Sequence, residues 1–220
     1  MSPHPWHWDR RPLLIAGCFA CFGPPIGAGD AAKEPGWAAA SLLFNRRPLA
    51  TAHASGEAAL PYEPGLLALR EGALLEAAVR ALPETPDVLL VNATGRDHPR
   101  RAGLALHLGT VLDIPTVGVT DRPLVGRGPP PEAIRSASSP LILGDEVVGR
   151  FVTSRAGVRP ITVHAAWRTD VDTAVAVVMA GVRRARTPEP IRRARRAARI
   201  ARAGEPPPSP GAAGRTQVAS

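Results

Sequence analysis

Apolar and polar positions alternate along the chain in blocks whose lengths predict an α/β fold. Apolar runs of strand length occur at residues 13–22, 38–44, 49–53, 87–91, 116–119, 141–143, 147–153 and 161–163. Helical spacing occurs at 66–82, 103–112 and 170–184, and a weakly amphipathic Arg/Ala helix is predicted at 191–203. This order predicts an antiparallel N-terminal meander followed by two units that resemble βαβ crossovers.

One polar segment precedes the predicted helix at 66–82, and another follows the predicted strand at 87–91. Residues 92–101 follow the run at 87–91, whose continuous apolar character favours a central strand. Open α/β sheets carry their sites at such strand ends. Residues 61–65 read PYEPG, in which two prolines restrict the backbone and Gly65 releases it into the helix. This turn is predicted to be rigid and exposed, with Tyr62 at its tip.

The positive charge is concentrated near the C-terminal end. The formal net charge is +8, and residues 183–202 contain nine Arg and one Glu, which accounts for all of it. Such a segment attracts nucleic acid through its phosphates. A solvated basic helix is the alternative interpretation.

Cys18 and Cys21 form a C-x-x-C pattern on the first apolar run, and His4 and His7 precede it. A redox pair and a zinc site are both conceivable from this spacing. The favoured interpretation is two small buried residues on a strand. Residues 15–18 read IAGC, which resembles a lipoprotein cleavage site, but the apolar stretch between Arg11 and this site is too short for an export signal. No run of about 18 apolar residues exists, so no transmembrane helix is expected. A cytoplasmic protein without membrane contact is predicted.

Four motifs in order resemble the endonuclease V family. They are PYEPGLL followed by REG at 61–72, GRDHPRRAG at 95–103, DIPTVGV at 113–119, and VDTA with PEP at 171–190. The resemblance covers roughly residues 13–192. It implies an RNase H-like fold, with a central mixed sheet flanked by helices. The domain is expected at 11–188, after a lead at 1–10 and before an Arg-rich helix at 189–203 and a disordered tail at 204–220.

The family resemblance implies a nuclease for deaminated bases in DNA or RNA. Its members recognise hypoxanthine and, with Mg²⁺, hydrolyse the second phosphodiester on its 3′ side. The turn at 61–65 resembles the family's wedge, which helps to hold the lesion base out of the stack. Glu63 departs from the usual apolar residue and adds a negative charge there. The residues expected to contact nucleic acid are Pro61, Tyr62, Glu63, Pro64, Gly65, Gly95, His98 and Arg100.

The family's catalytic carboxylates are mostly replaced in this sequence. Phe19 and Asn92 stand where the resemblance implies aspartates, and Trp167 stands where it implies a histidine or aspartate. Glu71 is retained, so it is the only metal ligand expected to remain. Asp121 matches a family lysine. Because Mg²⁺ requires several oxygen ligands, its binding is expected to be impaired.

The expected function is therefore binding at deaminated bases with weak or lost cleavage. An active endonuclease with relocated ligands, drawn from Asp97, Asp121 or Asp170, is one alternative. A scaffold that binds a partner through the Arg-rich segment is another. His98 is expected to be functional or to pair with a loop carbonyl, and His107 to be structural. The alternative interpretation of Glu71 is a surface or capping residue without a catalytic role.

Overall fold

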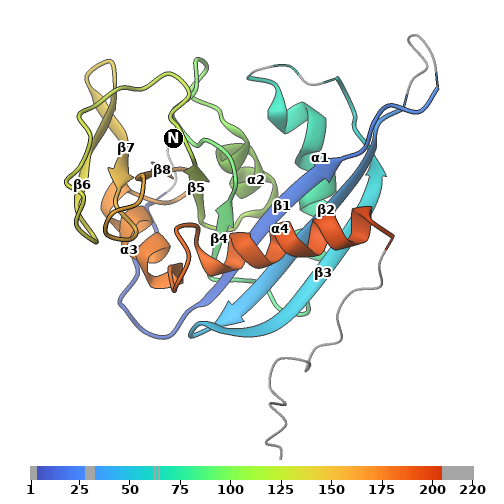
Figure 1. The fold of residues 1–220 in the computed structure, drawn as a ribbon, viewed down its shortest axis with the longest axis horizontal. Coiled ribbons are helices and arrows are strands. Elements are labelled where there is room, and N and C mark those ends of the chain that lie inside the picture. The colour runs from blue at the N-terminus through green and yellow to red at the C-terminus, as the bar shows by residue number, and fades with distance from the viewer. Residues whose placement is uncertain (1–3, 28–32, 62, 64, 205–220) are drawn as a thin grey trace, which may run out of the picture.

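The protein forms an eight-stranded mixed sheet with helices on both faces (Figure 1). The computed structural model describes residues 4–27, 33–61, 63 and 65–204. The strands are β1 (Leu14–Phe22), β2 (Pro35–Phe44), β3 (Arg47–Glu57), β4 (Val88–Val91), β5 (Thr116–Thr120), β6 (Ser138–Leu143), β7 (Glu146–Val152) and β8 (Ile161–Ala165). The helices are α1 (Leu67–Arg80), α2 (Leu104–Leu112), α3 (Val171–Gly181) and α4 (Glu189–Arg202).

The order of strands across the sheet is β3-β2-β1-β4-β5-β8-β7-β6. The first three strands form the predicted antiparallel meander. β1, β4 and β5 are parallel neighbours, linked by crossovers that contain α1 and α2. β4 is buried on both faces, as its continuous apolar sequence predicts. The carboxyl ends of β1 and β4 therefore lie at the same edge of the sheet.

Alternation along β1 divides the core between the two faces of the sheet. Ala16 and Cys18 pack toward α1 and α2, whereas Leu13 and Ile15 belong to the cluster that includes α3 and Ile191 of α4. The outer strands are longer than the apolar runs predict. β2 starts at Pro35 and β3 extends to Glu57, because the backbone hydrogen bonds that pair these strands do not require an unbroken apolar run.

Helix α4 is more strongly amphipathic than its sequence predicts. Ile191, Ala194 and Ala198 are fully buried against the sheet, while Arg192 and Arg196 are exposed. The prediction of weak amphipathicity was wrong, because short alanines are sufficient when the helix lies very close to β1. Gly17 permits that approach, since a Cβ atom there would overlap the backbone nitrogen of Ile191.

The remaining boundaries follow the sequence closely. Asp170 is the N-cap of α3, where its side chain accepts a hydrogen bond from the Thr173 nitrogen at 2.7 Å. β6 begins at Ser138, three residues before the predicted apolar run at 141–143. Trp6 and Trp8 of the N-terminal lead pack against the α3 side of the core. The tail predicted to be disordered lies, apart from Gly204, outside the described residues. Within the described part of the chain, no helix is both long and apolar enough to cross a membrane.

Candidate functional site

A cavity of about 350 Å³ lies beyond the carboxyl end of β4. Its walls come from β1, α1 and β4, and they include Phe19, Glu71 and Asn92. The register explains how they meet: Cys18 pairs with Val91, so the next residues of these parallel strands, Phe19 and Asn92, are also neighbours. Glu71 is carried by α1, which crosses one face of the sheet. Three of the four predicted catalytic positions are therefore brought together.

Arg195 of α4 reaches this group of residues from the other face of the sheet. Its Nη2 atom donates a hydrogen bond to Asn92 Oδ1 at 2.9 Å. Its guanidinium carbon lies 5.1 Å from the centroid of the Phe19 ring, which is within range of a cation–π contact. Partial burial lowers the pKa of Arg195, and the charge of Asp121 partly opposes that shift. A cation thus sits against both substituted positions.

Glu71 is an acid in a poorly solvated position. Burial raises its pKa to about 7, and the neighbouring Arg70 partly opposes the rise. Arg70 is itself occupied: its guanidinium pairs with Glu34, donates to the Leu60 carbonyl at 2.9 Å, and stacks over Phe22. Among the described residues, no hydrogen bond to the Glu71 carboxylate is formed. The surface or capping alternative for Glu71 does not agree with this placement, because its side chain lines the cavity.

His98 joins the loop after β4 to the turn before α1. The backbone nitrogen of Arg100 donates to His98 Nδ1 at 3.2 Å, so Nε2 carries the proton and donates to the Gly65 carbonyl oxygen at 3.1 Å. Gly65 has a φ of 82°, which favours glycine. The pairing with a loop carbonyl that the sequence left open is therefore found. Pro61 and Glu63 are exposed, while Tyr62 and Pro64 lie outside the described residues.

Comparison with known proteins identifies the family. A family model described as Endonuclease V matches residues 26–196, more than half of the chain. The chain belongs to the endonuclease V family. Among similar proteins, an endonuclease V of Roseiflexus castenholzii is 36% identical over 208 residues, covering 88% of this chain and 93% of that protein. One from Streptomyces avermitilis is 39% identical over 183 residues, covering 78% and 80%.

Solved endonuclease V structures share the fold, which is RNase H-like as predicted. The crystal structure of the Streptomyces avermitilis protein superposes with a TM-score of 0.79 at 35% identity, covering 92% of this chain and 85% of that chain. The catalytic domain of human endonuclease V gives 0.78 at 28% identity, covering 94% and 92%. A Ciona intestinalis endonuclease V was solved with a 24-mer DNA containing an inosine; at 21% identity and a TM-score of 0.73, covering 89% and 88%, it supports the fold alone.

The side chains at this endonuclease V site do not fit the Mg²⁺ that the family resemblance implies. Phe19 offers no ligand atom, and the amide oxygen of Asn92 is already bonded to Arg195. Glu71 alone presents a carboxylate, with a pKa that favours its neutral form more than usual. Across the described ranges, no group of three or more His, Cys, Asp or Glu side chains is arranged to hold a metal ion. Mg²⁺ prefers several charged oxygens, whereas this site contains a guanidinium.

Trp167 lies away from the other three predicted positions. β8 is antiparallel to β5, so the residues that follow β8 lie beside the start of β5, where the Trp167 carbonyl accepts from Thr116 nitrogen at 2.9 Å. Asn92 instead follows the end of the parallel strand β4. The Trp167 side chain packs over Gly109 of α2. The residue that does join Phe19 and Asn92 is Arg195, which the motif comparison missed. The sequence signal available for Arg195 was its spacing of four residues from Ile191, which places both side chains on the same side of the helix.

The three acids considered as relocated ligands are engaged elsewhere. Asp97 is fully buried and accepts backbone hydrogen bonds from Leu124, Val125 and Gly126 at 2.7–3.0 Å. Asp121 forms an ion pair with Arg186. Asp170 caps α3. None of them lines the cavity that contains Glu71.

Asp97 also belongs to a buried polar group that sequence reasoning overlooked. His164 Nδ1 lies 3.7 Å from Asp97 Oδ2, and His164 Nε2 lies 2.8 Å from Thr120 Oγ1. Burial lowers the pKa of His164 to about 4, although Asp97 opposes the shift. The Thr120 hydroxyl donates to the Arg122 carbonyl at 2.7 Å, so His164 Nε2 carries the proton. These contacts join the loops at the ends of β4 and β5.

The cysteines do not form a paired site. Cys18 faces the α1 side of the sheet, whereas Cys21 packs beside Ala198 of α4, with its sulfur 3.5 Å from that residue's carbonyl oxygen. Residues three apart on a strand point to opposite faces, which separates the two thiols. His4 is exposed, and His7 lies 3.2 Å from Asp170. The favoured interpretation of Cys18 as a buried strand residue is confirmed.

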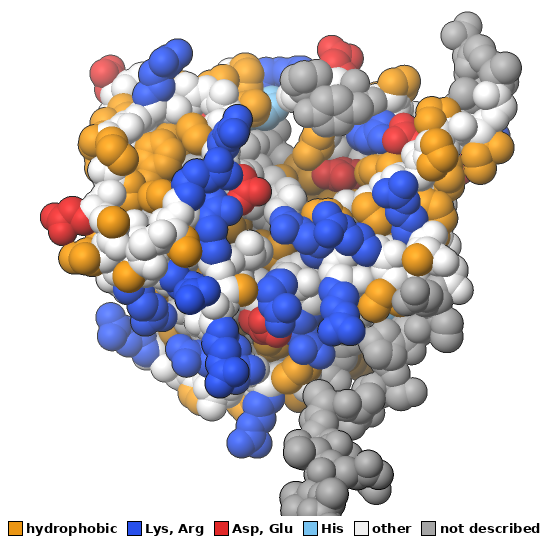
Figure 2. Space-filling view, viewed as in Figure 1, with side chains coloured by type: hydrophobic (Ala, Val, Ile, Leu, Met, Phe, Trp, Pro, Cys, Tyr) orange, Lys and Arg blue, Asp and Glu red, His pale blue; other side chains and the backbone are white. Residues whose placement is uncertain are grey.

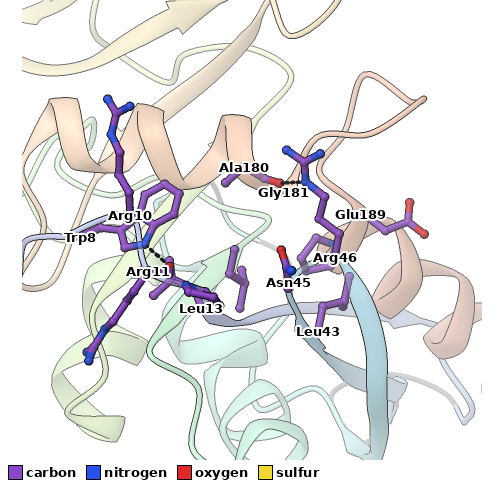
Figure 3. Close-up of a pocket in the computed structure, with 13 residues that line it drawn as sticks. Trp8, Arg10, Arg11, Leu13, Leu43, Asn45, Arg46, Ala180, Gly181 and Glu189 are labelled. Carbon is purple, nitrogen blue, oxygen red and sulfur yellow. Dashed lines mark hydrogen bonds between the residues drawn. The ribbon is translucent and has the colours of Figure 1, made fainter.

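A second cavity, of about 240 Å³, lies at the opposite end of β1 (Figure 3). Trp8 and Arg11 of the lead, Asn45 and Arg46 of the β2–β3 turn, and Glu189 contribute to its walls. Arg46 Nε donates to the Ala180 carbonyl at 3.1 Å across it. None of the predicted site residues lies there, so the cavity beside Glu71 remains the candidate site.

Basic side chains gather on the face of the molecule where α4 lies. Figure 2 shows Lys and Arg side chains spread over the face on which α4 lies. Arg192, Arg196, Arg199 and Arg202 are exposed on α4, and Arg183 and Arg184 are exposed just before it. The Arg-rich segment is therefore both a packed helix, through its alanines, and a basic surface, through its arginines. This surface is continuous along α4 with the helix position that carries Arg195.

Proposed function

We propose that this endonuclease V family protein binds DNA or RNA at deaminated bases, hypoxanthine above all, and has lost efficient cleavage. The observation that carries the proposal is the contact of Arg195 with both Phe19 and Asn92. Cleavage of a phosphodiester with Mg²⁺ needs converging carboxylates that bring the ion to the phosphate and to a water molecule. Here a guanidinium contacts both substituted positions, and one carboxylate lines the cavity.

Retention of the turn at 61–65 supports a binding role. An extruded base leaves a gap in the stack that a rigid turn with an aromatic tip can fill. His98 supports that turn from the loop after β4, because its ring bonds both Gly65 and Arg100. The basic surface on α4 supports attraction to phosphates. In this proposal, the domain at 11–188 and the helix at 189–203 act together on nucleic acid.

Recognition and cleavage are separable in this arrangement. The turn precedes α1 and is held by His98 of the loop after β4, whereas the substituted positions Phe19 and Asn92 lie on β1 and directly after β4. Loss of carboxylates removes the chemistry of hydrolysis without removing the surface that contacts the base or the backbone. Asp97, Asp121 and Asp170 all have other partners, which disfavours an active enzyme with relocated ligands.

The test measures binding and nicking on the same labelled duplexes, with a single inosine or with adenosine at that position. Mg²⁺, Mn²⁺ and EDTA are compared. The expected result is inosine-selective binding without enzyme-dependent nicking, with selectivity reduced in Tyr62→Ala. Nicking beside inosine that is abolished in Glu71→Ala would overturn the loss of cleavage. Absence of any nucleic-acid binding would overturn the proposal as a whole and favour a scaffold that binds a protein partner.

A further inference from the structure

A cation whose charge is only partly compensated lies against Phe19 and Asn92, two residues that line the cavity beyond β4. The Arg195 guanidinium contacts an aromatic ring and a neutral amide, and neither supplies a negative charge. Asp121 is the acid whose charge acts on Arg195, but its carboxylate is ion-paired with Arg186. A partly buried cation without its own counter-ion is costly for the protein alone, and an anionic ligand relieves that cost.

We propose that Arg195 binds a backbone phosphodiester of nucleic acid beside this cavity, through its fixed guanidinium and without a metal ion. The inference rests on the proposed function, since it identifies how the same site holds nucleic acid. It concerns affinity and position on the strand, and it involves no bond cleavage.

The geometry leaves donors on Arg195 for a phosphate. A guanidinium has five N–H groups, and one Nη2 hydrogen bond to Asn92 is formed within the described part of the chain. The Nε atom is buried and has no hydrogen-bond partner there, so the donors that a phosphate can reach are the remaining N–H groups of Nη1 and Nη2. The Phe19 ring and Asn92 Oδ1 hold the guanidinium plane from two directions. A planar donor fixed in this way is suited to the paired oxygens of a phosphodiester.

The surroundings favour a polymeric anion over a small isolated one. The exposed Arg196, Arg199 and Arg202 continue along the same helix, so a strand whose phosphate contacts Arg195 has further basic groups beside it. On its α1 side the cavity is lined by apolar Leu67 and Leu75 together with Arg70 and Glu71, and the two apolar side chains suit a sugar or base edge more than a free ion.

Arg196 provides a matched control for Arg195. It is the next residue of α4, it carries the same charge, and it is exposed, away from Phe19 and Asn92. Binding of an inosine duplex is measured in EDTA over a range of salt concentrations for the unaltered protein, Arg195→Gln and Arg196→Gln. Gln keeps an amide next to Asn92, and thermal unfolding of each variant reports whether the fold is retained. Arg195→Lys restores the charge if Arg195→Gln is unstable.

Arg195→Gln is expected to lose roughly tenfold in affinity, and its salt dependence should be shallower by about one phosphate contact. Arg196→Gln is expected to lose less affinity. A second arm replaces single phosphates near the inosine by uncharged methylphosphonates. Replacement of the phosphate that Arg195 contacts should weaken binding by the unaltered protein but not binding by Arg195→Gln. Equal losses for the two variants with no position-specific phosphate, or binding that requires Mg²⁺, would overturn the inference. If the unaltered protein binds no nucleic acid, the proposed function fails first.

Discussion

His98 Nε2 lies 3.1 Å from the carbonyl oxygen of Gly65, which links the loop after β4 to the turn that precedes α1. The two residues are 33 positions apart in the chain, so this bond forms only in the folded protein. It orients the exit of the turn at 61–65 through a side chain that is itself buried and held by Arg100. In the proposed function, recognition of a lesion by that turn therefore depends on a histidine that need not touch nucleic acid.

His98→Ala should weaken inosine-selective binding and lower the free energy of unfolding by about 1–2 kcal/mol, because two hydrogen bonds to the buried ring are lost. The measurements are affinity for inosine and adenosine duplexes, and chemical denaturation. His107→Ala is the control, since His107 is exposed on α2. Unchanged selectivity in a folded His98→Ala protein would show that the turn does not need this support.

Restoring acids at the substituted positions should create a metal site. The triple variant Phe19→Asp, Asn92→Asp, Arg195→Ala places two new carboxylates near Glu71 and removes the competing cation. We expect it to bind Mn²⁺, measured by calorimetry, and to show Mn²⁺-dependent nicking beside inosine. Adding Glu71→Ala should abolish both effects. A folded triple variant that binds no Mn²⁺ would mean that these side chains do not converge on one ion.

Glu71 should make stability depend on pH. Its pKa is raised by burial from 4.5 to about 7, so the folded state holds the proton more tightly than the unfolded state. The associated stability is full below 4.5 and is lost as the pH rises through about 7. Allowing for partial exposure, Glu71→Gln should stabilise the protein by about 2 kcal/mol at pH 8 and have little effect at pH 4. Glu84→Gln, in an exposed loop, is the control. An equal effect at both pH values would contradict this explanation.

Asp97→Asn should be strongly destabilising although it preserves shape. The carboxylate accepts three backbone hydrogen bonds in a buried setting, and an amide presents donors to some of the same groups. The expected loss is about 3 kcal/mol in the free energy of unfolding, measured by denaturation. Asp113→Asn, at a side chain that is 79% exposed, is the control and should change little. Equal stability of the two variants would remove the structural role assigned to Asp97.

Local sequence was sufficient for most of the fold. The strand at Val88–Val91 and the helices at Leu67–Arg80 and Leu104–Leu112 were predicted to within a few residues, because their apolar spacing is set by period and burial. The N-cap at Asp170 was predicted as well, since capping needs only neighbouring residues. The amphipathicity of α4 was underestimated because it depends on contact with Gly17 of β1.

Sequence determined which residue types stand at 19 and 92, where the family resemblance implies acids, and motif order alone assigned Glu71 to the helix at 66–82 and His98 to the loop at 92–101. Only the tertiary structure decided what surrounds them. It separates Trp167 from Asn92 because β8 runs antiparallel to β5, and it brings Arg195 to Asn92 from 103 residues away. A contact between distant segments depends on the direction and packing of whole strands and helices, and no local pattern of residues encodes that direction.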